Sequence, residues 1–204
     1  MVLPLLSSLL DSLPILSTFK AEKKAIAYSK EQVNSPELVI MRPTLVLGPG
    51  DSRFSSITLV HEFLKKNIPI VPPGGLSYVD VRDTADAFIA GMTKGVPGHA
   101  YLLGASNVSH SQFYNTLQTV SGVQAPSLRF PISIILFLLR LLYFFTWSLF
   151  GFWIKEKDPV FVEMGGVFWS IDSSRAKKEL GFAPRNPHDT LRDTIIYLRT
   201  LNKY

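Results

Sequence analysis

The chain contains no cysteine among its 204 residues. This absence excludes disulfide scaffolds, thiolate metal sites and cysteine nucleophiles. Its four histidines are far apart and lack the short paired spacing of a zinc site, and they are His61, His99, His110 and His188. We therefore predict no metal site.

Charged residues are also few. They make up 18% of the chain, against 47% hydrophobic residues, a balance that argues against disorder. The net charge is +5, and the lysines and arginines are scattered rather than collected with interleaved aromatic residues. The sequence therefore predicts a solvated surface, or attraction to phosphates or anionic lipid, and no nucleic-acid groove.

The N-terminal stretch gives only a weak signal for secretion, and the alternative is that it begins partway through a domain. Residues 1–19 are apolar and serine-rich, but they carry no basic n-region, include Asp11 and show no small-x-small cleavage site. We interpret residues 1–19 as a truncated or disrupted domain start.

Residues 20–75 show the alternation of helix and strand that is typical of a parallel sheet. Strong helix formers run from Lys20 to Glu31, and the apolar run Leu38 to Met41 predicts a strand buried on both faces. A strong turn signal follows at Gly48-Pro49-Gly50-Asp51. Helix, buried strand and glycine-rich loop in this order indicate an α/β fold.

The later part of the chain continues with helices and strands. We expect helices at 56–66, 82–92, 109–121, 174–180 and 190–201, and strands at 68–71, 98–103 and 167–169. Asp80 is a candidate N-cap for the helix from 82, and Asp172 or Ser173 for the helix from 174. Gly122 and Gly181 end their helices.

Residues 132–153 form a long apolar segment, in which seventeen of twenty-two residues are aliphatic or aromatic. As a helix it would be about 33 Å long, enough to cross a bilayer. Arg140 opposes insertion by about 2.5–3.5 kcal/mol, but the Leu, Ile and Phe residues more than offset that. We expect membrane contact through this segment, either spanning the bilayer or lying on it.

Five blocks of the sequence, taken in order, resemble one protein family. Ile40-Met41-Arg42-Pro43, followed by Val46 to Asp51, is similar to the sixth-strand segment of extended short-chain dehydrogenases/reductases, the NAD-dependent epimerase/dehydratase superfamily. The nearest subgroup is that of the 3β-hydroxysteroid dehydrogenases and dihydroflavonol-reductase-like proteins. The other blocks are 78–85, 98–104, 109–117 and 170–184.

The resemblance covers roughly residues 20–200 and implies the C-terminal half of a Rossmann-like, doubly wound parallel sheet. Residues 20–75 would belong to the Rossmann-like domain, and 76–204 to a small, mainly helical substrate-binding region. In that case, 132–153 would lie where family members place a helical substrate lid. The relatives that act on lipids suggest a membrane-associated protein, at the endoplasmic reticulum if the source is eukaryotic. A cytoplasmic location is the alternative.

The resemblance also implies site residues. In the family, the loop after the Arg-Pro strand runs beside the nicotinamide ring, so Pro43, Thr44 and Leu45 would contact NAD or NADP. This agrees with the rule that ligands bind at the carboxyl ends of parallel strands. The alternative for Pro43 to Leu45 is a plain structural turn.

The family's catalytic pair is a Tyr four residues before a Lys on one helix. The length usual in the family, counted back from Arg42, places the catalytic and ribose-binding lysine at Lys20. The Tyr position is then Leu16, which cannot transfer a proton. The alternative for Lys20 is a solvated helix lysine.

The family's Gly-x-x-Gly-x-x-Gly turn is missing from the chain, and Gly48-Pro49-Gly50 stands in the wrong context to replace it. An incomplete gene model, a truncated splice form or a degenerate paralogue would each explain this. The first hypothesis is an NAD(P)-dependent oxidoreductase, incomplete here, acting on a hydroxyl or keto group of a small apolar, sterol-like or lipid-like substrate. The alternatives are an inactive membrane-associated fragment that binds an apolar ligand or partner, and a nucleotide-sugar epimerase or dehydratase.

Overall fold

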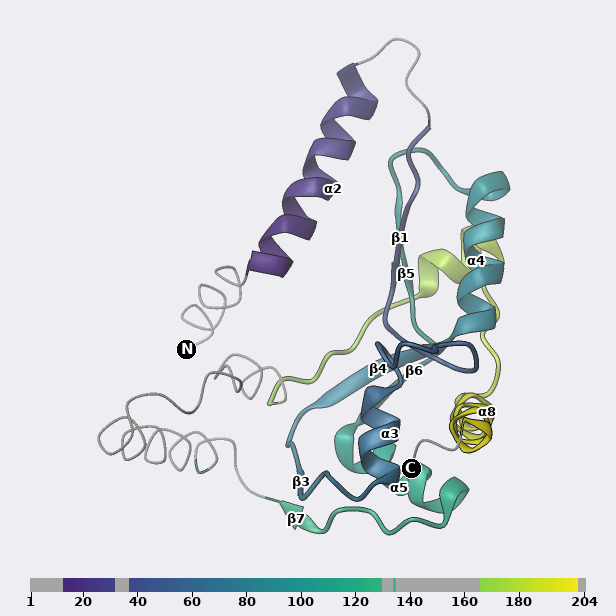
Figure 1. Ribbon diagram of the computed structural model, residues 1–204. Helices are drawn as coiled ribbons and strands as arrows, with labels where there is room; N and C mark the ends of the chain where they lie inside the picture. The colour runs from purple at the N-terminus through teal and green to yellow at the C-terminus, as the bar shows by residue number, and fades with distance from the viewer. Residues whose placement is uncertain (1–12, 32–36, 130–133, 135–165, 202–204) are drawn as a thin grey trace, which may run out of the picture.

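The computed structural model describes residues 13–31, 37–129, 134 and 166–201. These residues form an α/β fold, as the sequence predicts (Figure 1). In chain order the elements are α2 (Leu13–Glu31), β1 (Ile40–Pro43), β2 (Leu45–Leu47), α3 (Thr58–Leu64), β3 (Ile70–Val71), β4 (Gly75–Asp80), α4 (Val81–Lys94), β5 (Ala100–Leu103), β6 (Ser106–Ser109), α5 (His110–Ser121), β7 (Leu128–Arg129), η1 (Ala176–Leu180) and α8 (Pro187–Thr200).

The first layer is a parallel pair of strands between two helices. β1 and β5 pair in parallel, with Ile40 opposite Ala100 and Pro43 opposite Leu103. Arg42 is hydrogen-bonded to Glu22 of α2, whereas Met41 packs against Gly91 of α4. Because neighbouring residues of a strand point to opposite faces, α2 and α4 cover opposite faces of the pair.

The second layer is a three-stranded sheet in the order β2-β4-β6, with β2 parallel and β6 antiparallel to β4. Every residue of β4 is buried. Leu76 and Tyr78 pack into a core with α3, α5 and α8, while Val79 packs into a second core with Tyr101 and Leu103 of β5. β4 is therefore the strand that joins the two halves of the described structure.

Several predicted elements are confirmed by their cap residues. Asp80 accepts a hydrogen bond from the backbone N–H of Arg82 at 2.8 Å and begins α4. Ser109 and Gln112 form a capping box at the start of α5, and Gly122 ends that helix with a φ of 77°. Such caps satisfy the backbone groups that a helix end leaves unpaired.

Other predicted bounds were wrong. The helix expected from Lys20 begins at Leu13, so part of the stretch 1–19 is helical; Pro14 is tolerated there because it lies in the first turn. The first strand is 40–43 rather than 38–41. The strand expected over 167–169 is a single bridge from Phe168 to Gly75. The bounds of the helix expected over 174–180 are confirmed, although its last five residues, Ala176–Leu180, form a π-helix.

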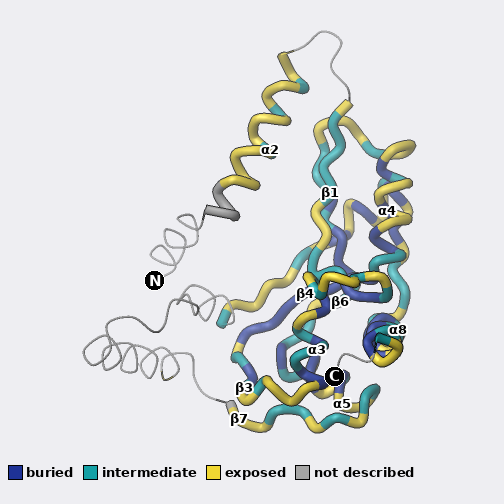
Figure 2. The backbone as a smooth tube through the Cα atoms, viewed as in Figure 1, coloured by how far each residue is buried: buried dark blue, intermediate teal, exposed yellow. Residues whose placement is uncertain are grey.

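The exposure of side chains differs between the elements. In Figure 2, β4 and the inner faces of α5 and α8 are buried, whereas the described side chains of α2 are mostly exposed. The apolar segment 132–153 lies outside the described residues, apart from Ile134. Within the described ranges, no helix has the length and apolar character needed to cross a membrane.

Candidate functional site

The chain changes strand partners at Thr44, between β1 and β2. The backbone N–H and the side-chain hydroxyl of Thr44 both donate to the carbonyl oxygen of Leu103, at 2.9 and 3.0 Å. Leu45 then pairs with Tyr78 of β4. The chain thus leaves the carboxyl end of β1 beside the carboxyl end of β5, which is where ligands bind in open α/β sheets.

The three residues predicted to contact the cofactor lie together at this strand end. Pro43 is the last residue of β1 and is exposed, while Thr44 and Leu45 are half-buried. Leu45 also packs against the core under α3, α5 and α8. The position of Pro43, Thr44 and Leu45 agrees with a cofactor wall, and it agrees equally with a structural turn.

The position of Lys20 follows from one ion pair. Arg42 Nε donates to Glu22 Oε2 at 3.2 Å, and a second contact joins Arg42 Nη2 to Glu22 Oε1. Because α2 runs antiparallel to β1 (Figure 1), Lys20 lies about 3 Å beyond Glu22 in the direction of the carboxyl end of β1. Lys20 is exposed, and it lies about 200° around α2 from Glu22.

Leu16 lies one turn before Lys20 on the same helix, so positions 16 and 20 have the spacing of the family's Tyr–Lys pair. Three of the chain's tyrosines are unsuited to act as the proton donor that is missing at position 16. Burial raises the pKa of Tyr78 and of Tyr114 to about 12. Burial, together with a hydrogen bond to Glu179, also raises the pKa of Tyr101. These phenols remain protonated and inaccessible.

A second segment reaches the same strand end from the C-terminal part of the chain. Ser173 Oγ accepts a hydrogen bond from the backbone N–H of Gly104 and donates one to its carbonyl oxygen, both at 3.0 Å. The side-chain amide of Asn107 likewise bonds both the N–H and the carbonyl oxygen of Ile171. The sequence predicted Ser173 only as a helix cap, and no local pattern indicates its bonds to Gly104.

A group of charged residues fixes the junction of β4 and α4. Asp80 is fully buried; Arg82 binds both of its carboxylate oxygens and also binds Asp193 of α8 at 2.7 Å. Arg185 binds Asp83 at 2.8 Å. Burial alone would raise the pKa of Asp80, but its hydrogen bonds with Arg82 and Thr190, together with the charge of Arg185, outweigh burial and lower that pKa.

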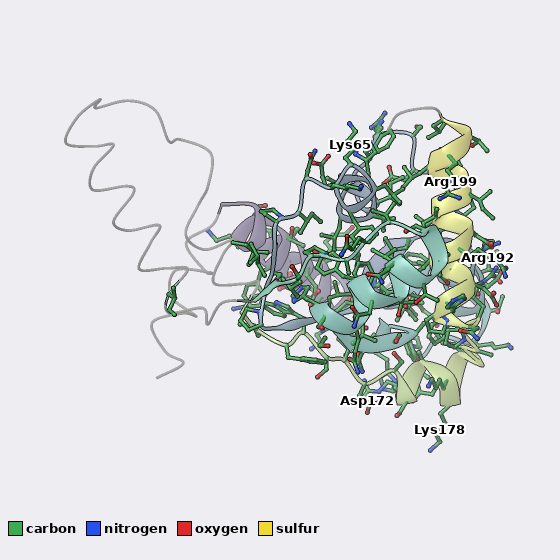
Figure 3. All side chains as sticks on the ribbon, turned by 90° about the horizontal axis from the view of Figure 1, so that it is seen from below. Lys65, Asp172, Lys178, Arg192 and Arg199 are labelled. Carbon is green, nitrogen blue, oxygen red and sulfur yellow. The ribbon has the colours of Figure 1, made fainter. Side chains whose placement is uncertain are left out.

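α8 itself carries two further arginines. Figure 3 shows Arg192 and Arg199 along this helix. Arg192 is paired with Asp189 at 2.9 Å, and Arg199 donates to the carbonyl oxygen of Ser121 at 2.8 Å. The pair of Arg192 lies within α8, whereas Arg199 joins α8 to the last residue of α5.

A dinucleotide cofactor needs a helix N-terminus with free N–H groups for its pyrophosphate. The starts of α4, α5 and α8 each have one such group bound by the side chain of their own N-cap residue, whereas α3 has no side-chain cap. Asp51 accepts the N–H of Ser56 at 2.7 Å before α3, and Asn186 accepts the N–H of His188 at 3.0 Å before α8. Asp80 and Ser109 cap α4 and α5.

The glycines of the 48–50 loop do not form a phosphate cradle either. Gly48 has a φ of 133°, and a Cβ there would lie 2.7 Å from Val81 Cγ1, so this glycine allows the loop to pack against α4. The described residues therefore assign Gly48 to packing rather than to phosphate binding. They also contain no group of three His, Asp or Glu side chains that could hold a metal ion.

The chain is similar to three curated proteins. It is 26% identical over 197 residues to a "Putative dihydroflavonol 4-reductase" of Synechocystis sp., covering 88% of this chain and 52% of that protein. It is 24% identical to sterol demethylase protein B of Methylococcus capsulatus (83% and 52%). It is 26% identical to the UDP-glucose 4-epimerase of Vibrio cholerae (83% and 48%). The chain spans about half the length of these relatives.

Solved structures show the same likeness. The crystal structure of gox2253 has a TM-score of 0.75 at 26% identity, over 92% of this chain and 56% of that one. A nucleoside-diphosphate-sugar epimerase from Pseudomonas aeruginosa has 0.73 at 20% identity (94% and 59%). The UDP-glucuronic acid 4-epimerase of Bacillus cereus in complex with NAD has 0.63 at 16% identity (92% and 52%). No family model matches the chain.

Proposed function

Because the chain belongs to the extended short-chain dehydrogenase/reductase superfamily, we propose that it carries the substrate side of an NAD(P)-dependent oxidoreductase. One observation supports this above the others. Thr44 and Ser173 bring two distant segments to Leu103 and Gly104 at the carboxyl end of β5, the end at which the fold binds ligands.

We further propose that the substrate is small, apolar and sterol-like or lipid-like, with a hydroxyl or keto group as the reacting centre. In this proposal Pro43, Thr44 and Leu45 contact NAD or NADP, and Lys20 has the role of the family's lysine. Leu16, one helical turn before Lys20, has no proton to donate. Catalysis therefore requires a proton donor in place of Leu16, as well as the part of the cofactor site that the described residues do not form.

A chimaera tests this proposal. The Gly-rich N-terminal part of the Synechocystis relative, as the family resemblance places it, would be joined ahead of α2, with Leu16 retained or changed by Leu16→Tyr. We expect the Leu16→Tyr chimaera to oxidise NADPH or NADH with a ketosteroid at least about a hundredfold faster than the Leu16 form, because a positioned acid contributes about 10²–10⁴. Adding Lys20→Met should remove that gain, whereas Lys24→Met should leave it.

A nucleotide-sugar epimerase is a second candidate function, favoured by the relatives from Vibrio cholerae and Pseudomonas aeruginosa. The same chimaeras distinguish it. Conversion of UDP-glucose to UDP-galactose, without ketosteroid reduction, would support the epimerase. Leu16 favours a third candidate, an inactive protein that binds an apolar ligand or partner, and failure of both reactions in the Leu16→Tyr chimaera would support it.

Membrane contact through residues 132–153 is a separate proposal, supported by the apolar composition of that segment. Alkaline carbonate extraction of cells expressing the chain tests it. Retention in the pellet supports an integral segment, at the endoplasmic reticulum in a eukaryotic cell. Release into the supernatant supports the cytoplasmic alternative.

A further inference from the structure

Residues 166–169 run beside the first residue of β4, and the backbone fixes their place. The N–H of Gly75 donates to the carbonyl oxygen of Val167 at 3.1 Å, and the N–H of Trp169 donates to that of Gly75 at 3.0 Å. β6 occupies the other edge of Gly75 through Ser109. Phe168 therefore lies along the same edge of β4 as β2, which pairs with β4 nearer to its carboxyl end.

The distance from Phe168 to the predicted cofactor wall follows from this edge. Phe168 lies opposite Gly75, and Leu45 lies opposite Tyr78, three residues further along β4. Three residues of a strand span about 10 Å. Phe168 and Leu45 are thus separated by roughly the length of a small ring system along one edge of one strand.

The face on which Phe168 projects is set by the alternation of β4. A Cβ at Gly75 would lie 2.4 Å from Phe168 Cε2, so the ring lies on the face shared by Gly75, Ser77 and Val79. Val79 packs with Leu103 of β5. The ring of Phe168 therefore lies on the face of β4 that is turned to the carboxyl end of β5. Trp169, the next residue, points to the opposite face.

Phe168 is held in place and still exposed. Its ring covers Gly75, and yet 48% of its surface is open to solvent. The segment that follows is fixed to the end of β5 and to β6 by Ser173 and Asn107. An aromatic ring that is fixed before binding loses little entropy when a ligand stacks on it.

Two described segments beside Phe168 contain no cationic residue. Residues 104–109 and 166–173 contain no lysine or arginine. Arg82 and Arg185 are already paired with Asp80 and Asp83. A diphosphate would therefore find no basic partner in these segments, whereas an apolar ring would be accepted.

We propose that Phe168 is a specificity-determining residue that stacks on an apolar ring of the substrate. This inference rests on the proposed function and names a residue of the same site. The ring of the substrate lies against Phe168, and its hydroxyl or keto group is directed along β4 toward Thr44 and Leu45.

Calorimetric titration of the full 204-residue chain with androst-4-ene-3,17-dione, and separately with UDP-glucose, tests the proposal. We expect Phe168→Ala to weaken steroid binding about tenfold, since a buried aromatic contact commonly contributes that much. Phe168→Leu keeps an apolar side chain without the ring and should weaken it about threefold. Thermal unfolding of each variant verifies that it is folded. If Phe168→Ala does not fold, the comparison of Phe168→Leu with wild type decides the test.

Two matched controls accompany these variants. Phe88 on α4 has nearly the same exposure, 46%, and Phe88→Ala should leave steroid binding unchanged, as should Trp169→Leu. Equal binding by wild type and Phe168→Ala would overturn the proposal, as would an equal loss in Phe88→Ala or binding of UDP-glucose in place of the steroid. If steroid binding depends on Phe168 but the chimaeras catalyse no reaction, the proposed function would be rejected and the proposed role of Phe168 would stand.

Discussion

Thr44 and Ser173 bond to adjacent residues, Leu103 and Gly104, at the carboxyl end of β5. Thr44 donates two hydrogen bonds to Leu103, and Ser173 exchanges two with Gly104. The relative position of the segments 43–45 and 171–173 is thus set by the last residue of β5 and the residue that follows it.

Ser173→Ala should destabilise the chain. The variant leaves the N–H and the carbonyl oxygen of Gly104 without their partner in a buried place, and unpaired buried groups cost about 1–3 kcal/mol. Urea denaturation measures the loss in the free energy of unfolding. Ser174→Ala is the matched control, because Ser174 is exposed and keeps its backbone bond to Asp172. Equal losses in Ser173→Ala and Ser174→Ala would contradict the assignment.

Asp80→Asn should lower stability at neutral pH, by about 2 kcal/mol. Breaking a fully buried ion pair costs about 3–5 kcal/mol, and the partial exposure of Arg82 reduces this. Asparagine can still cap α4, so the loss reports the charge rather than the cap.

The pH dependence of Asp80→Asn follows from the lowered pKa of Asp80. The carboxylate stabilises the fold above its unfolded pKa of about 3.9, and that contribution is lost as the pH falls through the lower folded pKa. Unfolding measured from pH 7 down to pH 3 should show a flatter acid limb in Asp80→Asn than in wild type. Parallel curves would show that Asp80 is not the titrating group.

His110 should make the fold sensitive to mild acid. Burial lowers the pKa of His110 at the start of α5. Its neutral form is therefore favoured in the folded state, and stability is lost as the pH falls below the unfolded pKa of about 6.5. His110→Gln should reduce the change in thermal unfolding temperature between pH 7 and pH 5. The exposed His188→Gln should keep the wild-type change, and a matching effect in both variants would refute the role of burial.

Local signals in the sequence predicted the helix ends well. Asp80, Gly122 and Gly181 were recognised because a cap depends on residues within one turn of it. β4 was missed because Ser77 and Asp80 interrupt its apolar pattern. Asp80 is buried there because Arg82 and Arg185 pair with it, and the packing of Arg185 against β4 cannot be read from spacing.

The candidate site was predicted only in part, because its hydrogen bonds join residues that lie far apart in the sequence. The resemblance indicated Pro43, Thr44 and Leu45, and the structure places them at a strand end. The partner of Thr44 is 59 residues away, and Ser173 and Gly104 are 69 residues apart. Such pairs are made by the tertiary fold and leave no periodic trace in the sequence.

The 204-residue chain should show no measurable NADH binding. The chain lacks the Gly-x-x-Gly-x-x-Gly turn, and the starts of α4, α5 and α8 each already bind one N–H group through Asp80, Ser109 and Asn186. A pyrophosphate therefore finds no glycine-rich cradle at these helices. One wall at Pro43 to Leu45 cannot hold a dinucleotide through van der Waals contact alone. NADH fluorescence titration and calorimetry measure this, with the Bacillus cereus epimerase, which was solved with NAD, as the positive control. Binding at micromolar concentration would contradict the prediction.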